Sequence, residues 1–258
     1  MLGGCAGPSA PLDRGDPTLD WPPAASAGPG RIMGRIRPEL SHAWIAVEPA
    51  GPLAKLGHAH LIGGPVIEGV VVMATDPAHS AVDLAIELGR IDVDRPEWRT
   101  EAGLQPLDEA ARTGTRANLM GPAVLDAARY PRIELRARGL HCGDQGWELE
   151  PVLLFQARRY RLKVPVELML TDGNLVASGA FELNHADLGL QPFSAAGGAL
   201  KVADPIRIRF RITAEAGADA TDIIGHWACE PASGRVLAHR GSRQTAVDPN
   251  QLAHVGQE

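Results

Sequence analysis

One nine-residue segment, residues 205–213, restricts the possible folds more than any other part of the chain. Its sequence, PIRIRFRIT, alternates apolar and basic side chains without a break. Since successive side chains of a strand point to opposite sides, this pattern predicts a strand with one buried and one solvated face. The inward side chains would be Ile206, Ile208, Phe210 and Ile212, and the outward ones Arg207, Arg209 and Arg211.

The same alternation recurs in three other segments, residues 82–88, 132–138 and 160–170. One-sided strands in this number predict an antiparallel sheet that is closed on itself or packed on another sheet. A closed sheet has an interior, and an apolar interior can hold an apolar ligand. The inward side chains of these segments would be Val82, Leu84, Ile86, Leu88, Ile133, Leu135, Ala137, Leu162, Val164, Val166, Leu168 and Leu170.

Turn and helix signals place the remaining elements. The pair Asp172-Gly173 predicts a tight hairpin. Residues 108–129 predict two short helices, because Asp108 can cap the first, Gly114 and Pro122 should interrupt the region, and residues 122–129 can form the second. Glycines within residues 61–74 predict bends in a strand. The predicted strands are residues 42–48, 61–74, 80–92, 132–140, 147–157, 159–171, 174–184 and 203–214.

Glycine and proline are frequent at both ends of the chain, which predicts an ordered middle and loose termini. We therefore expect a signal remnant and flexible linker over residues 1–38, a β domain over residues 39–214 and a flexible tail over residues 215–258.

The first residues have the form of a bacterial lipoprotein signal. In Leu2-Gly3-Gly4-Cys5 a pair of small residues precedes a cysteine that would receive the lipid. The charged and apolar regions of a signal peptide are missing, so either the true start lies upstream or the match arises by chance. We expect the first alternative, with lipidation of Cys5, a membrane tether and a location in the periplasm.

Two further cysteines, Cys142 and Cys229, remain if Cys5 carries lipid. In an exported protein such a pair is a candidate disulfide, which would attach the tail to the β domain. Two free thiols are the alternative, and the sequence leaves both open.

Four segments of the sequence resemble the YceI-like family in the same order. Residues 41–47 are similar to its opening strand, and residues 116–120 with 124–135 to its helix and the Tyr-Pro step that follows. Residues 181–189 are similar to a strand that ends at an acidic residue near a glycine, and residues 202–210 to the closing strand. The resemblance covers residues 40–214, and the long termini and the segment around His58 depart from it.

The resemblance implies a mainly β fold, a lipocalin-like extended antiparallel β-barrel with a short helical insertion. It also implies that the interior holds a long polyisoprenoid chain and that the domain lacks catalytic machinery. Aromatic residues make up only 4% of the chain, so short aliphatic side chains would leave room inside. The candidate lining residues are Val82, Leu84, Ile86, Ile133, Leu135, Leu162, Val164, Val166, Leu168, Phe181, Ile206, Ile208 and Phe210.

Other functions have weaker signals. His58 and His60 would share one face of a strand and could reach one metal ion, with His42, His185 or Asp187 as a conceivable third ligand. A polar pair at the barrel mouth is the simpler interpretation. The sequence has no Gly-x-Ser-x-Gly, P-loop or His-Glu-x-x-His motif, and a net charge of -6 gives no indication of nucleic-acid binding.

The sequence therefore predicts a non-enzymatic protein of the bacterial cell envelope that binds or carries an isoprenoid or isoprenoid quinone. It predicts no cofactor beyond such a bound lipid, and it leaves a homodimer open. Enlarging Leu84 or Ala180 should reduce ligand uptake. The alternative is a structural or metal-responsive envelope protein whose barrel is filled by its own side chains.

Overall fold

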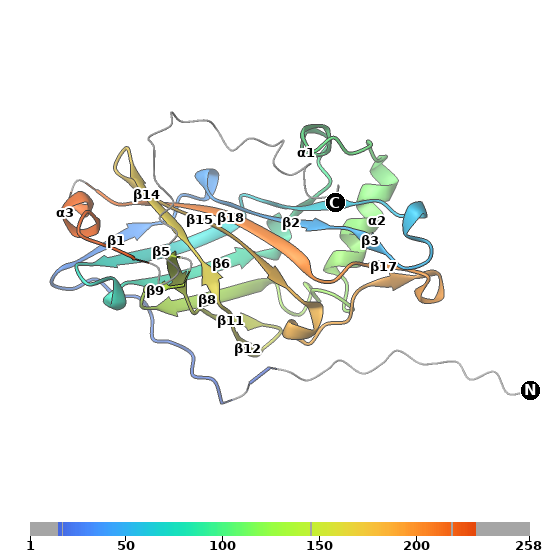
Figure 1. Ribbon diagram of the computed structural model, residues 1–258. Helices are drawn as coiled ribbons and strands as arrows, with labels where there is room; N and C mark the ends of the chain where they lie inside the picture. The colour runs from blue at the N-terminus through green and yellow to red at the C-terminus, as the bar shows by residue number, and fades with distance from the viewer. Residues whose placement is uncertain (1–14, 17, 145, 218, 231–258) are drawn as a thin grey trace, which may run out of the picture.

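The computed structural model describes residues 15–16, 18–144, 146–217 and 219–230. Two six-stranded sheets face each other, and the predicted antiparallel β architecture is confirmed, because every paired strand in them is antiparallel. Their hydrogen-bond ladders form two separate sheets rather than one continuous ring. Figure 1 shows the two sheets as layers that run along the long axis of the molecule.

The first large sheet, sheet A, has the strand order β1-β5-β6-β8-β11-β12. The alternating segments 82–88 and 132–138 lie side by side in it, with Val82 opposite Ala137 and Leu84 opposite Leu135. Its strands are β1 Arg31–Arg35, β5 Ile67–Ala74, β6 Ala81–Glu87, β8 Arg132–Arg138, β11 Val152–Phe155 and β12 Arg158–Arg161.

The second large sheet, sheet B, has the order β14-β15-β18-β2-β4-β7. Asp172 and Gly173 join β14 to β15 with φ angles of 49° and 72°, which is the predicted two-residue hairpin. The strands of sheet B are β2 His42–Val47, β4 His60–Gly64, β7 Asp92–Val93, β14 Glu167–Thr171, β15 Asn174–Leu183 and β18 Ile206–Glu215.

Two three-stranded sheets complete the architecture. We call the first the bridging sheet; it has the order β13-β10-β9 and includes β9 His141–Gly143, β10 Gly146–Leu149 and β13 Val164–Pro165. The second, the end sheet, includes β3 Pro49–Ala50, β16 Ser194–Ala195 and β17 Leu200–Val202. The sequence predicted none of β1, β3, β9, β16 and β17 as separate strands.

Several long predicted strands are divided where the chain passes from one sheet to another. Residues 61–74 form β4 in sheet B and β5 in sheet A, and the change of direction includes Gly64 with a φ of 129°. Residues 159–171 divide into β12, β13 and β14 for the same reason, and residues 80–92 into β6 and β7. In residues 159–171 the alternation continues across the breaks, because Val164, Val166 and Leu168 all face inward. In the other two segments the inward positions shift at the break, from Ile62 to Ile67 and from Leu88 to Ile91.

The helices differ from the prediction. Helix α2, Glu109–Met120, begins after Asp108, whose side chain accepts a hydrogen bond from the Ala111 amide as predicted. Gly114 lies inside this helix without interrupting it, and residues 122–129 form turns rather than a second helix. Helix α1, Pro96–Glu101, lies in a segment for which neither a strand nor a helix was predicted. The 3-10 turns are Pro38–Leu40, Ala54–Leu56, Pro77–His79, Leu88–Arg90, His185–Leu188 and Ala196–Gly198.

The prediction of a flexible N-terminal linker is wrong for the residues of that segment that the structure describes. Residues 18–30 lie along the outer side of sheet A, where Arg159 Nη1 donates to the Leu19 carbonyl at 2.8 Å. The guanidinium of Arg136 lies 5.0 Å from the ring centre of Trp21. A Pro-rich segment satisfies its carbonyls here with outward arginines of the sheet. Cys5 lies outside the described residues.

The prediction of a flexible C-terminal tail over residues 215–258 is also wrong in part. Helix α3, Ala220–Ile224, follows β18 and packs on β5, with Ala216 and Ala220 buried beside Met73 and Leu175. Figure 1 shows α3 at one end of the sheets and α2 at the other. The sequence hides this contact because alanines carry no visible periodicity in a Gly/Ala-rich segment.

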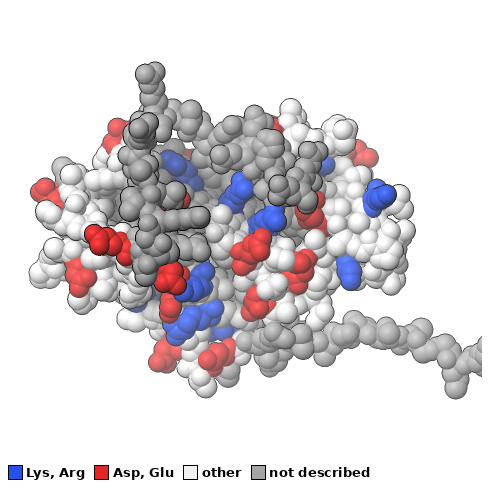
Figure 2. Space-filling view, viewed as in Figure 1, with Lys and Arg blue, Asp and Glu red and all other residues white. Residues whose placement is uncertain are grey.

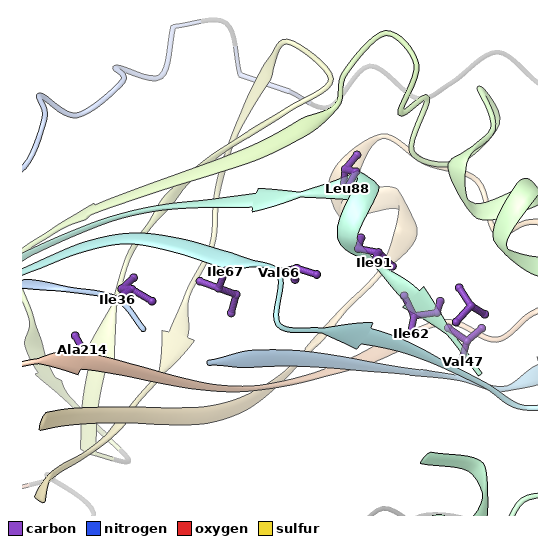
Figure 3. Packing of buried hydrophobic residues seen from close by; sticks show 9 residues of the cluster. Ile36, Val47, Ile62, Val66, Ile67, Leu88, Ile91 and Ala214 are labelled. Carbon is purple, nitrogen blue, oxygen red and sulfur yellow. The ribbon is translucent and has the colours of Figure 1, made fainter. Parts of the chain in front are cut away.

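A core cluster closes the end of the sheets near α2. Val47 and Ile62 from sheet B meet Leu88, Ile91 and Val93 there, and all five are buried. Figure 3 shows that side chains of this cluster lie between the ribbons of the two sheets. Leu119 and Met120 of α2 pack against the same cluster.

Charged side chains cover the outside. Figure 2 shows Lys and Arg beside Asp and Glu on the viewed face rather than in one single-charge patch. Arg207 in the predicted outward stripe pairs with Glu182 at 3.0 Å across β18 and β15. In the described part of the chain, helices are too short or too polar to cross a membrane.

Candidate ligand-binding cavity

An apolar cavity of about 180 Å³ lies between sheets A and B. Sheet A contributes residues of β5, β6 and β8, and sheet B contributes residues of β2, β14, β15 and β18. Leu149, Val164 and Val166 add a third wall from the bridging sheet and its neighbouring loop. The gap between the two large sheets on this side is thus covered by strands that belong to neither of them.

Small inward side chains leave this space empty. Ala43, Ala177 and Ala214 line the cavity at adjacent strands of sheet B, and Ala81 lines it from sheet A. Protein interiors are otherwise packed with few voids larger than a water molecule, so a cavity of this size is informative. Gly179 on β15 is small for a different reason, since there is no room for a side chain: a Cβ there would lie 2.7 Å from the Phe210 ring and 2.3 Å from the Pro165 carbonyl oxygen.

The cavity offers a ligand no free polar group among the described residues that line it. Ser80 Oγ accepts a hydrogen bond from the Ala74 amide at 3.1 Å. The indole Nε1 of Trp227 donates to the Ala74 carbonyl at 3.0 Å. The other lining residues have aliphatic or phenyl side chains. Such a cavity excludes water and favours an apolar occupant.

Most of the predicted lining residues border this cavity. They are Val82, Leu84, Ile86, Leu135, Val164, Val166, Leu168, Phe181, Ile208 and Phe210. Ile133 instead packs between two core clusters, and Leu162 packs against the cluster of Leu153, Phe155 and Tyr160. Ala180 is exposed on the outer face opposite Arg209, so its prediction as an inward residue is wrong.

The sequence missed lining residues for several reasons. On β5 the unbroken run Val70-Val71-Val72 conceals the alternation that would have shown an inward face. Ile212 was predicted to face inward but was not named as a lining residue, and Ala177 lies within β15 on the same face as Phe181. The others lie at strand ends, in connecting segments or in the tail, where no pattern marks them. The missed residues are Ala43, Ile67, Val71, Val72, Ser80, Ala81, Leu140, Leu149, Pro151, Leu175, Ala177, Ile212, Ala214 and Trp227.

A second hollow, of about 400 Å³, lies on the outer face of sheet B. Its lining includes Trp44, Glu182 and Arg207, as well as Ile206, which was predicted to line the interior. Glu182 and Arg207 pair with each other there. This outer hollow, which has charged side chains in its lining, is separate from the apolar space between the sheets.

The proposed histidine pair is not arranged as a shared metal site. His58 is exposed and precedes β4, so it does not share a strand face with His60. His60 Nδ1 lies 2.6 Å from Asp94 Oδ2. Among the described residues, the structure contains no group of three His, Cys, Asp or Glu side chains that could hold a metal ion.

The conceivable third ligands have other partners. His185 Nδ1 lies 3.0 Å from Asp204 Oδ1. Asp187 accepts from the Asn184 amide at 3.0 Å and closes a capping box. The His42 ring contacts Trp44 on the outer face, and burial, together with Arg211, lowers the pKa of His42.

Asp94 is the centre of a buried polar cluster. It is fully buried, and Arg99, which is 2% exposed, donates to its Oδ1 at 2.8 Å. The Leu61 amide donates to the same oxygen at 3.0 Å. Burial raises the pKa of Asp94, but the hydrogen bonds from His60, Leu61 and Arg99 outweigh it, so the pKa lies below its usual value.

Acidification should therefore weaken the fold in part through Asp94. A carboxyl group with a depressed pKa in the folded state stabilises the fold above the unfolded pKa, about 3.9. That contribution is lost as the pH falls through the folded pKa. The free energy of unfolding of D94N, measured by urea denaturation at a series of acidic pH values, should fall less steeply than that of the wild type. Equal slopes would contradict this role.

Cys142 and Cys229 form a disulfide with a Cα–Cα distance of 5.3 Å. Of the two alternatives that the sequence left open, the structure contains the bridge. It connects β9 of the bridging sheet to the segment after α3, 87 residues further along the chain. Cys142 is exposed and Cys229 is half-buried.

Comparisons with solved structures give low sequence identities. Burkholderia cenocepacia BcnA is 12% identical with a TM-score of 0.48, over 69% of this chain and 98% of that one. A polyisoprenoid binding domain from Saccharophagus degradans is 12% identical with a TM-score of 0.47, over 71% and 98%. A Campylobacter jejuni YceI protein is 9% identical with a TM-score of 0.41, over 57% and 79%.

No family model matches the chain. No curated protein matches it either. Two of the three structures carry the names YceI and polyisoprenoid binding, which are those of the family that the sequence motifs resemble. At these TM-scores, what this chain binds has to be inferred from its own cavity.

Proposed function

We propose that this protein binds an apolar, isoprenoid-type ligand between sheets A and B and performs no catalysis on it. The apolar cavity carries this proposal, because a barrel filled by its own side chains would not leave a space of about 180 Å³. The aliphatic lining matches a branched hydrocarbon chain, which needs contact and no hydrogen-bond partner. The four segments that resemble the YceI-like family support the same ligand class.

The cavity volume bears on the length of the chain. An engineered apolar cavity of roughly 150 Å³ admits benzene, so the space as it stands takes only about one or two isoprene units. About ten buried carbons contribute roughly 8 kcal/mol, of which at least about 4 kcal/mol is lost on association. The remainder corresponds to a Kd of roughly 1 mM. Tight binding therefore requires a longer chain and a cavity that widens.

The bridging sheet is the wall that can widen. It lies between the edge strands β12 and β14, which are not hydrogen-bonded to each other. Moving it apart from sheets A and B breaks none of the ladders within them. Its short strands pair over two or three residues, whereas β15 and β18 pair over ten.

A series of prenyl alcohols of increasing length, titrated by calorimetry, tests the proposal. Each added isoprene unit should tighten binding until the cavity can lengthen no further. Native mass spectrometry should show one chain per protein molecule, and an organic extract of protein from its native cells should contain the physiological ligand. Absence of binding along the whole series, by folded protein, would favour the filled-barrel alternative.

The same protein is proposed to act in an oxidising compartment, the periplasm of a bacterial envelope. The bridge between Cys142 and Cys229 supports this, since disulfides persist mainly in such compartments. A lipid on Cys5 would hold the protein at the membrane from which an isoprenoid is taken. Mass spectrometry of the mature chain isolated from cells would show a lipid-modified Cys5, and an unmodified chain in the cytoplasm would contradict both parts.

A further inference from the structure

The C-terminal segment covers the end of the cavity that is far from the core cluster of Val47 and Ile62. We call residues 216–217 and 219–230 the cap. The cap belongs to neither large sheet, although α3 packs on β5. Ala216 and Ala220 are buried against Met73 and Leu175.

Trp227 is the residue of the cap that lines the cavity. Its indole Nε1 donates to the Ala74 carbonyl at 3.0 Å. Its ring meets Trp147 of the bridging sheet edge to face, with 6.2 Å between ring centroids. One hydrogen bond to sheet A and one aromatic contact to the bridging sheet therefore fix the ring at the cavity end.

The disulfide holds the cap from its other side. Cys229, two residues after Trp227, is bonded to Cys142 on β9. Cys142 is paired across the ladder with Trp147, the aromatic neighbour of Trp227. The cap is thus attached to sheet B through the end of β18 and to the bridging sheet through a covalent bond.

The two ends of the cavity differ in what closes them. At the end away from the cap, Ile67 and Ile86 line the cavity and pack with the core cluster of Val47 and Ile62. They lie opposite each other in the ladder of β5 and β6, so they cannot withdraw without breaking that ladder. At the end covered by the cap, Trp227 is held by one hydrogen bond and by side-chain contacts. The length of the cavity can consequently change at the cap end.

We propose that Trp227 ends the binding cavity and sets the longest apolar chain that the protein accepts, with the Cys142–Cys229 bridge keeping the cap closed. This rests on the proposed function, because it concerns the ligand of the same cavity. The indole is an apolar wall with its one polar atom turned to Ala74, so it blocks a chain without offering it a hydrogen bond.

The test compares chain-length preferences of W227L and the wild type with the same prenyl alcohol series. W227L, which keeps an apolar side chain in the contact with Met73 and Leu175, should shift the preferred length upward and bind the longest chains at least tenfold more tightly. W21A is the matched control, because Trp21 lies on the outer side of sheet A against Arg136. Its preference should equal that of the wild type.

The double variant C142S/C229S separates the bridge from the ring. It should release bound chains faster than the wild type while keeping the wild-type length preference, because Trp227 is still present. Calorimetry and stopped-flow displacement measure the two quantities, and circular dichroism checks that each variant is folded.

The outcomes distinguish the two hypotheses. If the wild type and W227L bind the series with the same length preference, Trp227 is not the end of the site, although apolar binding itself stands. If neither binds any chain, the proposed function fails and the role of Trp227 fails with it. An upward shift in W227L alone supports the role of the cap.

Discussion

Replacing Arg99 with methionine should lower the free energy of unfolding by about 3–5 kcal/mol. Arg99 is 3% exposed at its side chain, and Asp94 is fully buried. The substitution removes the 2.8 Å contact to Asp94 and the bonds to the Ala59 and Gln105 carbonyls, each at 2.7 Å. It leaves the buried carboxylate of Asp94 without the guanidinium that neutralises it. Removing one member of a buried ion pair costs more stability than replacing both members with apolar residues.

The matched control is R95M, which changes an arginine of the same region that is 45% exposed. Arg95 pairs with Asp92 at 2.7 Å on the surface, where such pairs contribute at most about 1 kcal/mol. Urea denaturation at neutral pH measures both variants. An equal decrease in the free energy of unfolding in R99M and R95M would show that the buried pair of Arg99 and Asp94 stabilises the fold no more than a surface pair does.

Filling the cavity should abolish ligand binding. In A177F a phenyl ring enters a space of about 180 Å³, and a benzene ring fits a cavity of roughly 150 Å³, so the ring occupies most of the room. We expect at least a hundredfold weaker binding of the prenyl chain that the wild type binds best. The fold should persist because the ring fills an existing void instead of displacing packed side chains.

A180F is the matched control for A177F. Ala180 lies on the same strand, β15, but is exposed on the outer face opposite Arg209. It adds the same ring to the protein without narrowing the cavity, and its affinity should equal that of the wild type. Calorimetry gives the affinities and thermal unfolding gives the stabilities. Wild-type affinity in A177F would exclude the space between the sheets as the binding site.

Local patterns determined which side chains face inward. Val82, Leu84 and Leu135 line the cavity as their alternation predicts, because the two-residue period of a strand depends only on the neighbouring backbone. The Asp172-Gly173 hairpin follows for the same reason, since a type of turn depends on the φ angles that its own residues tolerate. The Asp108 cap is equally local.

Sequence patterns failed where the outcome depended on distant parts of the chain. Residues 159–171 alternate throughout, yet they divide into three strands because the chain changes sheets while keeping one face inward. Gly114 stays helical, although a local penalty argued for a break, because packing of α2 against the core outweighs a cost of about 1 kcal/mol. Segments without periodicity, at residues 18–30 and 219–230, gave no signal of their contacts.

By itself, then, the sequence determined an antiparallel β protein with an aliphatic interior, because alternation and turn chemistry act within a few residues. Only the tertiary structure decided which inward side chains border a void, since an empty volume depends on the sizes of residues from two sheets at once. Ala177 and Ile133 are both inward, but only Ala177 lines the cavity. The position of Trp227 at the end of the cavity was likewise decided by packing and by the nearby disulfide, which joins Cys229 to Cys142, 87 residues away in the chain.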